Sequence, residues 1–196
     1  MTRLKNEPGK FYSIQADVSK EEDILKAFEW VEKNLGTVHI LVNNAGLRKP
    51  TNLIEGSTEM WKEMFDTNVL GLCIATREAV KSMKKGNVDG HIIHINSTVG
   101  HKVIYMPQSN VYPASKFAVT ALTETLRQEL NSIGSKIKIT SISPGTVDSE
   151  FRKALGEIDC PKIQSKDVAD AVLFVLGTPP HVQVHELIIK PVGEAL

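Results

Sequence analysis

Apolar residues along this chain alternate between short runs typical of strands and longer stretches with helical spacing. The run VHILVNNAG, at 38–46, has the pattern of a buried strand that ends in a glycine turn. The preceding stretch, 20–36, places apolar residues three and four positions apart and ends at a glycine. Strand and helix patterns that alternate in this way predict βαβ units, and therefore a doubly wound α/β domain with a parallel sheet and helices on both faces.

The same patterns place the remaining elements. Strands are expected at 11–18, 90–98, 136–145 and 185–191. Helices are expected at 58–85, 110–134 and 165–178. No repeat, low-complexity run or linker interrupts the series, so residues 1–196 are expected to form a single domain.

Composition and charge narrow the class of protein. A hydrophobic share of 41% and a charged share of 23% are ordinary for a globular protein with a core. The 23 basic residues balance 23 acidic ones, which argues against nucleic acid or an anionic membrane as a partner. No apolar run approaches the roughly 20 residues of a membrane span. Two distant cysteines and a polar N-terminus without a signal-peptide core favour a reduced, cytoplasmic protein.

Polar and small residues follow three predicted strands at the point where each strand ends. They are NNAG at 43–46, NST at 96–98 and SPG at 143–145. The helix after the second of these strands begins with VYPASKFAV, which carries Tyr112 and Lys116. Doubly wound sheets bind their ligands at the carboxyl ends of the strands, so these four segments are expected to converge on one crevice.

Tyr112 and Lys116 are four residues apart and therefore share one face of the predicted helix. A free tyrosine titrates near 10, so a phenolate at neutral pH requires a drop of about 3 pKa units, or about 4 kcal/mol. A nearby ammonium group and a cationic nicotinamide ring in a partly dry site could supply that drop. Tyr112 could then exchange a proton with a substrate hydroxyl or carbonyl that Ser97 holds, while hydride moves to or from the nicotinamide.

This set of motifs resembles that of the short-chain dehydrogenases/reductases, over almost the whole chain. The shared motifs occur in the family's order: NNAG at 43–46, NVLG at 68–71, Ser97, YPASK at 112–116 and PGTV at 144–147. Each motif is weak alone, but together they are specific. Ser97 and Tyr112 are 15 positions apart (112 − 97), more than in many members, and this extension resembles the branch of farnesol-dehydrogenase-like enzymes.

The resemblance implies a Rossmann-like doubly wound domain and a role for each matched residue. Tyr112 would be the general acid/base, Lys116 would lower its pKa and bind the nicotinamide ribose, and Ser97 would orient the carbonyl. Asn68 would help to hold a water in a proton relay. The remaining matched positions would contact the dinucleotide: Asp17 and Val18 at the adenine, Asn44, Ala45 and Gly46 at the adenosine ribose, and Pro144, Gly145, Val147 and Ser149 at the nicotinamide end.

The resemblance also implies the ligands and partners. The cofactor would be NADP or NAD, with NADP favoured. The substrate would be a small apolar alcohol or carbonyl compound, isoprenoid or steroid-like. Helices 58–85 and 110–134 match the elements through which the family forms homodimers and homotetramers.

One element of the resemblance is missing from the sequence. No G-x-x-x-G-x-G precedes residue 11, so the turn that cradles the pyrophosphate at a helix N-terminus is not found, nor are the first two strands. We therefore expect an N-terminally truncated domain with weakened dinucleotide binding. Strand 11–18 would lose its neighbour and 38–42 would become a sheet edge, unless these two strands pair. A catalytically silent remnant that acts through subunit contacts is the alternative function.

Structural roles are the alternative for several of these residues. Asn43 and Asn44 could be turn formers, Ser97 a cap and Asn68 a buried hydrogen-bonding residue. Cys73 is expected to be a core thiol. The run HVQVH, at 181–185, has the spacing of a metal site on a helix but leads into a predicted strand, so no metal site is expected there.

Overall fold

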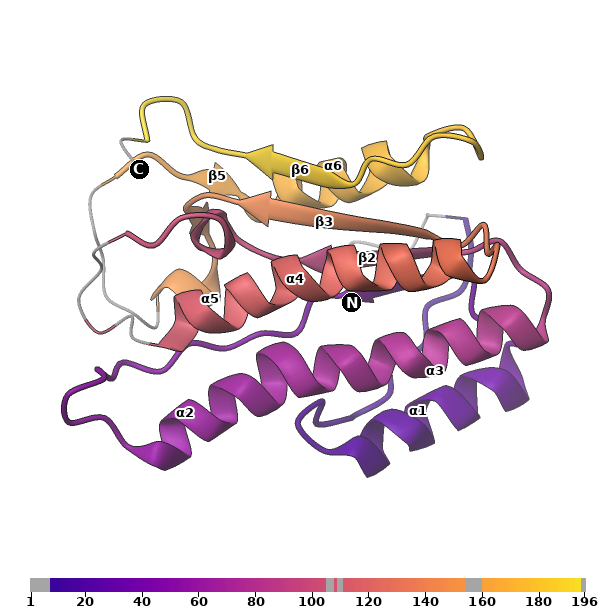
Figure 1. The fold of residues 1–196 in the computed structure, drawn as a ribbon, viewed down its shortest axis with the longest axis horizontal. Helices are drawn as coiled ribbons and strands as arrows, with labels where there is room; N and C mark the ends of the chain where they lie inside the picture. Colours follow the sequence, from indigo (N-terminus) through magenta and orange to yellow (C-terminus); the bar gives the residue numbers. More distant parts are fainter. Residues whose placement is uncertain (1–7, 105–107, 109–110, 154–159, 195–196) are drawn as a thin grey trace.

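Helices and strands alternate along the chain in the computed structural model, which describes residues 8–104, 108, 111–153 and 160–194. Figure 1 shows their arrangement. The elements are α1 (Glu21–Asn34), β1 (Ile40–Asn43), α2 (Thr58–Phe65), η2 (Asp66–Gly71), α3 (Leu72–Lys85), β2 (His91–Ile95), η3 (Thr98–Gly100), α4 (Val111–Ser132), β3 (Lys138–Pro144), β4 (Val147–Asp148), α5 (Glu150–Lys153), β5 (Ile163–Gln164), α6 (Ser165–Leu176) and β6 (Glu186–Ile189).

Four strands form a parallel sheet in the order β1-β2-β3-β6. In its register, Leu41 lies beside Ile92, and Ile92 beside Ile139. The strands β4 and β5 form a separate parallel pair of two residues each. Strands this short carry no readable alternation of polar and apolar residues, so the sequence did not predict them. The carboxyl ends of β1, β2 and β3 lie at one edge of the main sheet, as expected.

Helices cover both faces of the main sheet. Neighbouring residues of a strand point to opposite faces. Ile92 packs in one core cluster with Met83 of α3 and Leu130 of α4. Ile93, the next residue, packs in another cluster with Val175 of α6. The prediction of a doubly wound α/β fold is therefore confirmed: α3 and α4 lie on one face and α6 on the other (Figure 1). No helix in the described part of the chain is long and apolar enough to cross a membrane.

The helix predicted at 58–85 is continuous but contains a π-helical turn, η2, between α2 and α3. At the end of this turn, Gly71 lies against the main chain of Val18, where an added Cβ would come 2.4 Å from the Val18 carbonyl oxygen. Asn68, which is 2% exposed, lies within the turn. Such turns are often found at functional sites, and here the turn carries one of the predicted site residues.

The strand predicted at 11–18 is not formed. Residues 10–17 have no regular secondary structure, and Phe11 and Ile14 are exposed. Tyr12 instead packs against Trp30 of α1, with ring centroids 5.6 Å apart. No described segment pairs with the outer side of β1, so residues 38–42 lie at an edge of the sheet, as expected, and the alternative pairing with 11–18 is not found. A strand pattern becomes a strand only where a neighbour takes its backbone hydrogen bonds.

Candidate active site

A crevice of about 900 Å³ opens at the carboxyl ends of β1, β2 and β3. Most of the predicted site residues line it: Asn44, Ala45, Gly46, Ser97, Tyr112, Lys116, Pro144, Gly145, Val147 and Ser149. Asp17 and Val18 are not among the lining residues. Asp17 is exposed and accepts hydrogen bonds from the main chain and hydroxyl of Ser19, in the turn that leads into α1.

Tyr112 is buried at the start of α4, and its phenol interacts with the Ser97 side chain. Burial raises the pKa of Tyr112 to about 12, although the interaction with Ser97 and the positive charge of Arg48 both act to lower it. The protein's own groups therefore keep the phenol protonated, in contrast to the lowered pKa expected from the sequence. Burial decides this outcome, because it penalises the charged phenolate more than the neighbours stabilise it.

Lys116, one helical turn further along α4, is 6% exposed. Its Nζ donates a hydrogen bond of 2.9 Å to the Ile95 carbonyl oxygen and lies 5.9 Å from the centroid of the Tyr112 ring. Burial lowers the pKa of Lys116 to about 8. An ammonium group has three donors, and Ile95 takes one of them, so Lys116 has N–H groups to offer the hydroxyls of a ligand in the crevice.

Asn68 lies behind the crevice and connects two of its walls. Its side chain accepts a hydrogen bond of 2.8 Å from the Leu47 N–H and donates one of 2.9 Å to the Leu47 carbonyl. It also donates to the Ser115 hydroxyl at 3.0 Å, and that hydroxyl donates to the Tyr112 carbonyl at 2.7 Å. Asn68 thus holds the loop after β1 against the first turn of α4.

Comparison with known proteins agrees with this geometry. A sequence model of the short chain dehydrogenase family matches residues 1–159. The chain belongs to the short-chain dehydrogenase/reductase family. Farnesol dehydrogenase of Aedes aegypti is 56% identical over 187 residues, which cover 94% of this chain and 76% of that relative. Human dehydrogenase/reductase SDR family member 11 is 46% identical over 195 residues, which cover 94% of this chain and 75% of that relative. The resemblance noted in the sequence is therefore confirmed, including the branch.

Solved structures of the family share the fold. An alcohol dehydrogenase from Thermococcus sibiricus, complexed with 5-hydroxy-NADP, superposes with a TM-score of 0.86 at 26% identity, over 98% of this chain and 80% of that one. The closed form of serine dehydrogenase complexed with NADP+ superposes with a TM-score of 0.84 at 31% identity, over 98% of this chain and 81% of that one. The chain is thus a short-chain dehydrogenase/reductase by sequence and by fold.

Much of the lining of this dehydrogenase/reductase crevice is apolar. Phe151 packs against Tyr112 with ring centroids 5.8 Å apart. Val99 is buried in one cluster with Tyr112, and Ile104 packs against this cluster. Other apolar side chains of the lining are Val42, Ile95, Val147, Val168, Val172 and Leu173. An apolar compound could therefore lie beside the Ser97 and Tyr112 hydroxyls.

Two charged residues that line the crevice were not predicted from the sequence. Arg48, two positions after the NNAG motif, lines the crevice and acts electrostatically on Tyr112. Glu194 lines it from the chain segment after β6. Proximity to NNAG is a weak signal that could have pointed to Arg48. Nothing in the local pattern could have pointed to Glu194, because only the tertiary fold brings it to the loop after β3.

His94 lies beneath the site as a neutral core residue. Its Nδ1 is 3.0 Å from the Thr123 hydroxyl and its Nε2 is 3.3 Å from the Thr76 hydroxyl. Burial, together with the positive charge of Lys116, lowers the pKa of His94 to about 3. This histidine therefore adds no positive charge beside Lys116 at neutral pH.

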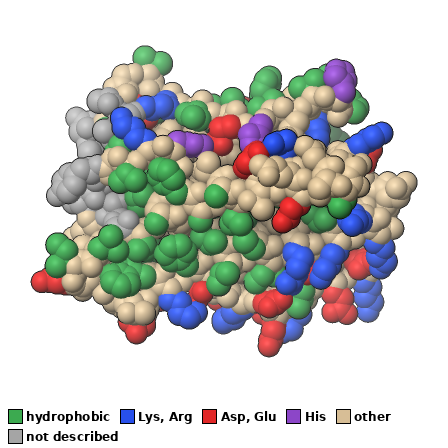
Figure 2. Space-filling view, in the orientation of Figure 1, with side chains coloured by type: hydrophobic (Ala, Val, Ile, Leu, Met, Phe, Trp, Pro, Cys, Tyr) green, Lys and Arg blue, Asp and Glu red, His purple; other side chains and the backbone are tan. Residues whose placement is uncertain are grey.

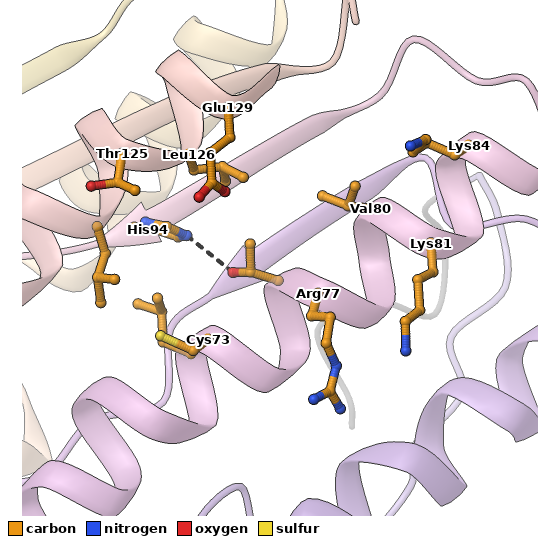
Figure 3. A pocket seen from close by; sticks show the side chains of 12 residues that line it. Cys73, Arg77, Val80, Lys81, Lys84, His94, Thr125, Leu126 and Glu129 are labelled. Atoms are coloured by element: carbon orange, nitrogen blue, oxygen red, sulfur yellow. Dashed lines mark hydrogen bonds between the residues drawn. The ribbon is translucent and has the colours of Figure 1, made fainter. Parts of the chain in front are cut away.

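A second hollow, of about 410 Å³, lies between α3 and α4 (Figure 3). Cys73 and Val80 of α3 and Leu126 of α4 line it, with His94 between the two helices. Cys73 is only half-buried, yet burial raises the pKa of its thiol, which makes it a poor nucleophile. No tyrosine or serine is among the described residues that line the hollow, so it lacks the tyrosine and serine pair of the first crevice.

Proposed function

We propose that this chain interconverts an alcohol and a ketone or aldehyde with NADP(H) or NAD(H), NADP being favoured. The observation that carries the proposal is that Ser97, Tyr112 and Lys116 line one crevice, in which the Ser97 side chain interacts with the Tyr112 phenol. Two hydroxyls side by side can hold one substrate oxygen, and a lysine one turn away can reach a ligand from the same wall. The NADP complexes among the structural neighbours support the choice of cofactor.

The residues present fit a nicotinamide ribose. Lys116 has donors beyond the one that Ile95 takes. At Gly46, an added Cβ would lie 4.0 Å from the Lys116 nitrogen, so a glycine here leaves room in front of the ammonium group. A bound nicotinamide would supply the hydride acceptor or donor, and its oxidised ring would add a positive charge near the phenol.

The residues of the chain would handle the substrate oxygen and its proton. In reduction, the Ser97 and Tyr112 hydroxyls would donate hydrogen bonds to the carbonyl oxygen, and Tyr112 would transfer its proton as the alkoxide forms. A pKa of about 12 keeps Tyr112 protonated and ready for this transfer. In oxidation, Tyr112 would accept the alcohol proton, and the Lys116 and Arg48 charges would reduce the free-energy cost of the phenolate.

An apolar substrate, isoprenoid or steroid-like, fits the lining best. Phe151, Ile104 and Leu173 would remove apolar surface from water as such a molecule binds. The name of one relative, farnesol dehydrogenase, points to the same chemical class. Cys73 and Cys160 are not joined by a disulfide, which suits a reducing compartment such as the cytoplasm.

A homodimer or homotetramer formed through α2–α3 and α4 is part of this proposal. Figure 2 shows hydrophobic side chains gathered over α4 and the neighbouring α2 and η2. Met60 of α2, Leu70 of η2 and Phe117 of α4 are large apolar residues with exposed surface. The hollow between α3 and α4 lies next to these elements. A second copy of the chain would cover such surface.

Turnover and binding together test the proposed function. Purified protein is titrated with NADPH and with NADH by fluorescence, and farnesol oxidation is followed by the appearance of the reduced cofactor. We expect saturable binding and turnover that depends on Tyr112. Subunit association without saturable dinucleotide binding would support the alternative, a silent member of the family that acts through contacts with other copies.

A further inference from the structure

Glu194 belongs to the turn after β6 but lies against the loop that follows β3. Its side chain is 8% exposed and lines the crevice beside Gly145 and Thr146. The two segments are also joined by their main chains, since the Gly145 N–H donates a hydrogen bond of 2.8 Å to the Ile189 carbonyl. The loop that was predicted to meet the nicotinamide end is therefore assembled together with this glutamate.

One carboxylate oxygen of Glu194 is fully used by the protein. Oε1 accepts hydrogen bonds from the Thr146 N–H and from the Thr146 hydroxyl, both at 2.8 Å. Gly145 leaves the space that the carboxylate occupies, because an added Cβ there would come 2.5 Å from Oε2 and 2.9 Å from Oε1. Glycine at 145 and glutamate at 194 are thus two parts of the same local arrangement.

The other oxygen, Oε2, has an unused capacity to accept hydrogen bonds. It is buried, and no hydrogen bond reaches it from the residues that the structure describes. The Lys190 nitrogen lies 3.5 Å away, close enough for an ion pair but long for a hydrogen bond. A buried acceptor without a donor is unfavourable. A ligand that brings an N–H group to this end of the crevice would remove that penalty.

We propose that Oε2 of Glu194 accepts a hydrogen bond from the carboxamide N–H of the nicotinamide ring, so that Glu194 selects the amide over other substituents on that ring. This inference rests on the proposed function and deepens it. The amide is the N–H donor that a dinucleotide carries at its nicotinamide end. A carboxylate at the same ring position has no proton to donate, so it could not form this hydrogen bond with Oε2.

The test compares two dinucleotides that differ only in this substituent: NADP+ and its nicotinic acid counterpart, which carries a carboxylate. Dissociation constants are measured by calorimetry without substrate, so a substrate hydroxyl cannot account for the result. We expect the unmodified protein to prefer the amide by about tenfold or more, as for one charge-assisted hydrogen bond. Glu194→Gln keeps an oxygen for Thr146 but presents an N–H₂ group to the ligand, so this preference should disappear or reverse.

Val192→Ala is the matched control. Val192 is 98% exposed, belongs to the same turn and does not line the crevice, so its substitution should leave the preference unchanged. If Glu194 only holds the loop, Glu194→Gln will weaken the binding of both dinucleotides equally, or will not weaken it at all. The inference is then wrong, while the proposed function stands. An unmodified protein that binds both dinucleotides equally also overturns it, even if the variant does not fold. If neither dinucleotide binds, the proposed function and this inference fail together.

Discussion

The side chain of Asn68 exchanges two hydrogen bonds with the main chain of Leu47, 21 residues earlier in the sequence. Through Ser115 the same amide also reaches the first turn of α4, where Tyr112 lies. The π turn in the long helix thereby connects the loop after β1 to the first turn of α4. Asn68 acts on the crevice through other residues, since it does not line the crevice itself.

Asn68→Ala should lower both stability and turnover. The N–H and carbonyl groups of Leu47 would each lose a partner, at a cost of about 1–3 kcal/mol for each group that stays buried. Urea denaturation measures the free energy of unfolding, and Asn34→Ala serves as the control. Asn34 is exposed, and its side chain donates a hydrogen bond to the Trp30 carbonyl. Asn34→Ala should therefore change the free energy of unfolding by about 0.5 kcal/mol or less. Equal effects of the two substitutions would contradict the role assigned to Asn68.

Tyr112→Phe should reduce turnover by about 10²-fold or more while leaving dinucleotide binding nearly unchanged, because it removes one proton-carrying oxygen and little else. Steady-state kinetics and a fluorescence titration of the same preparation separate the two effects. Tyr12→Phe makes the same chemical change outside the crevice and should be neutral. If the Tyr112 variant keeps more than about a tenth of the activity, Tyr112 is not the general acid/base.

Gly100→Ala should destabilise the protein and disturb the site. An added Cβ at 100 would lie 2.8 Å from both the Asn96 side-chain oxygen and the Lys116 carbonyl oxygen. Relieving such contacts in a packed region costs about 1–3 kcal/mol. Gly177→Ala is the control, because the nearest atoms there are 3.5 and 3.6 Å away. Thermal unfolding that shows Gly100→Ala to be as well tolerated as Gly177→Ala would contradict the close approach of η3 to α4.

Stability should fall as the pH is lowered below about 6.5 towards 4. Burial lowers the pKa of His91 to about 4 and that of His94 to about 3. Between these values and the pKa of about 6.5 in the unfolded chain, the unfolded state binds more protons, so acid favours unfolding. Urea denaturation at a series of pH values measures this slope. The double variant His91→Gln/His94→Gln should flatten it, whatever its stability at neutral pH; an unchanged slope would assign the acid sensitivity to other groups.

At alkaline pH, Lys116 contributes a dependence of stability on pH that has the same sign as that of the two histidines. Burial lowers its pKa to about 8, against about 10.4 for an unfolded lysine. Over that range the unfolded state binds more protons, so Lys116 makes stability rise with pH between about 8 and 10. Lys116→Met should remove this rise in urea denaturation curves. A variant with the same pH dependence as the unmodified protein would show that the ammonium group is not desolvated in the folded state.

Local patterns in the sequence were sufficient for the order of the long helices and of the four strands of the main sheet, and for the convergence of the strand ends on one crevice. Alternating periods of apolar residues specify βαβ units, and these units bring the ends of their strands to one edge of a sheet. The four-residue spacing of Tyr112 and Lys116 places both on one helical face. For these features, neighbours along the chain carry all the information that the geometry needs.

Other features depend on contacts between distant segments, and only the tertiary structure decided them. Residues 11–18 have a strand pattern but lack a neighbouring strand in the described chain, so they remain irregular. The pKa of Tyr112 lies above its usual value because burial outweighs the groups nearby. Glu194 reaches the crevice only because β6 pairs with β3, which carries its carboxylate to Thr146, 48 residues away in sequence. Backbone pairing, burial and long-range contacts are properties of the folded chain, and no local pattern of residue types encodes them.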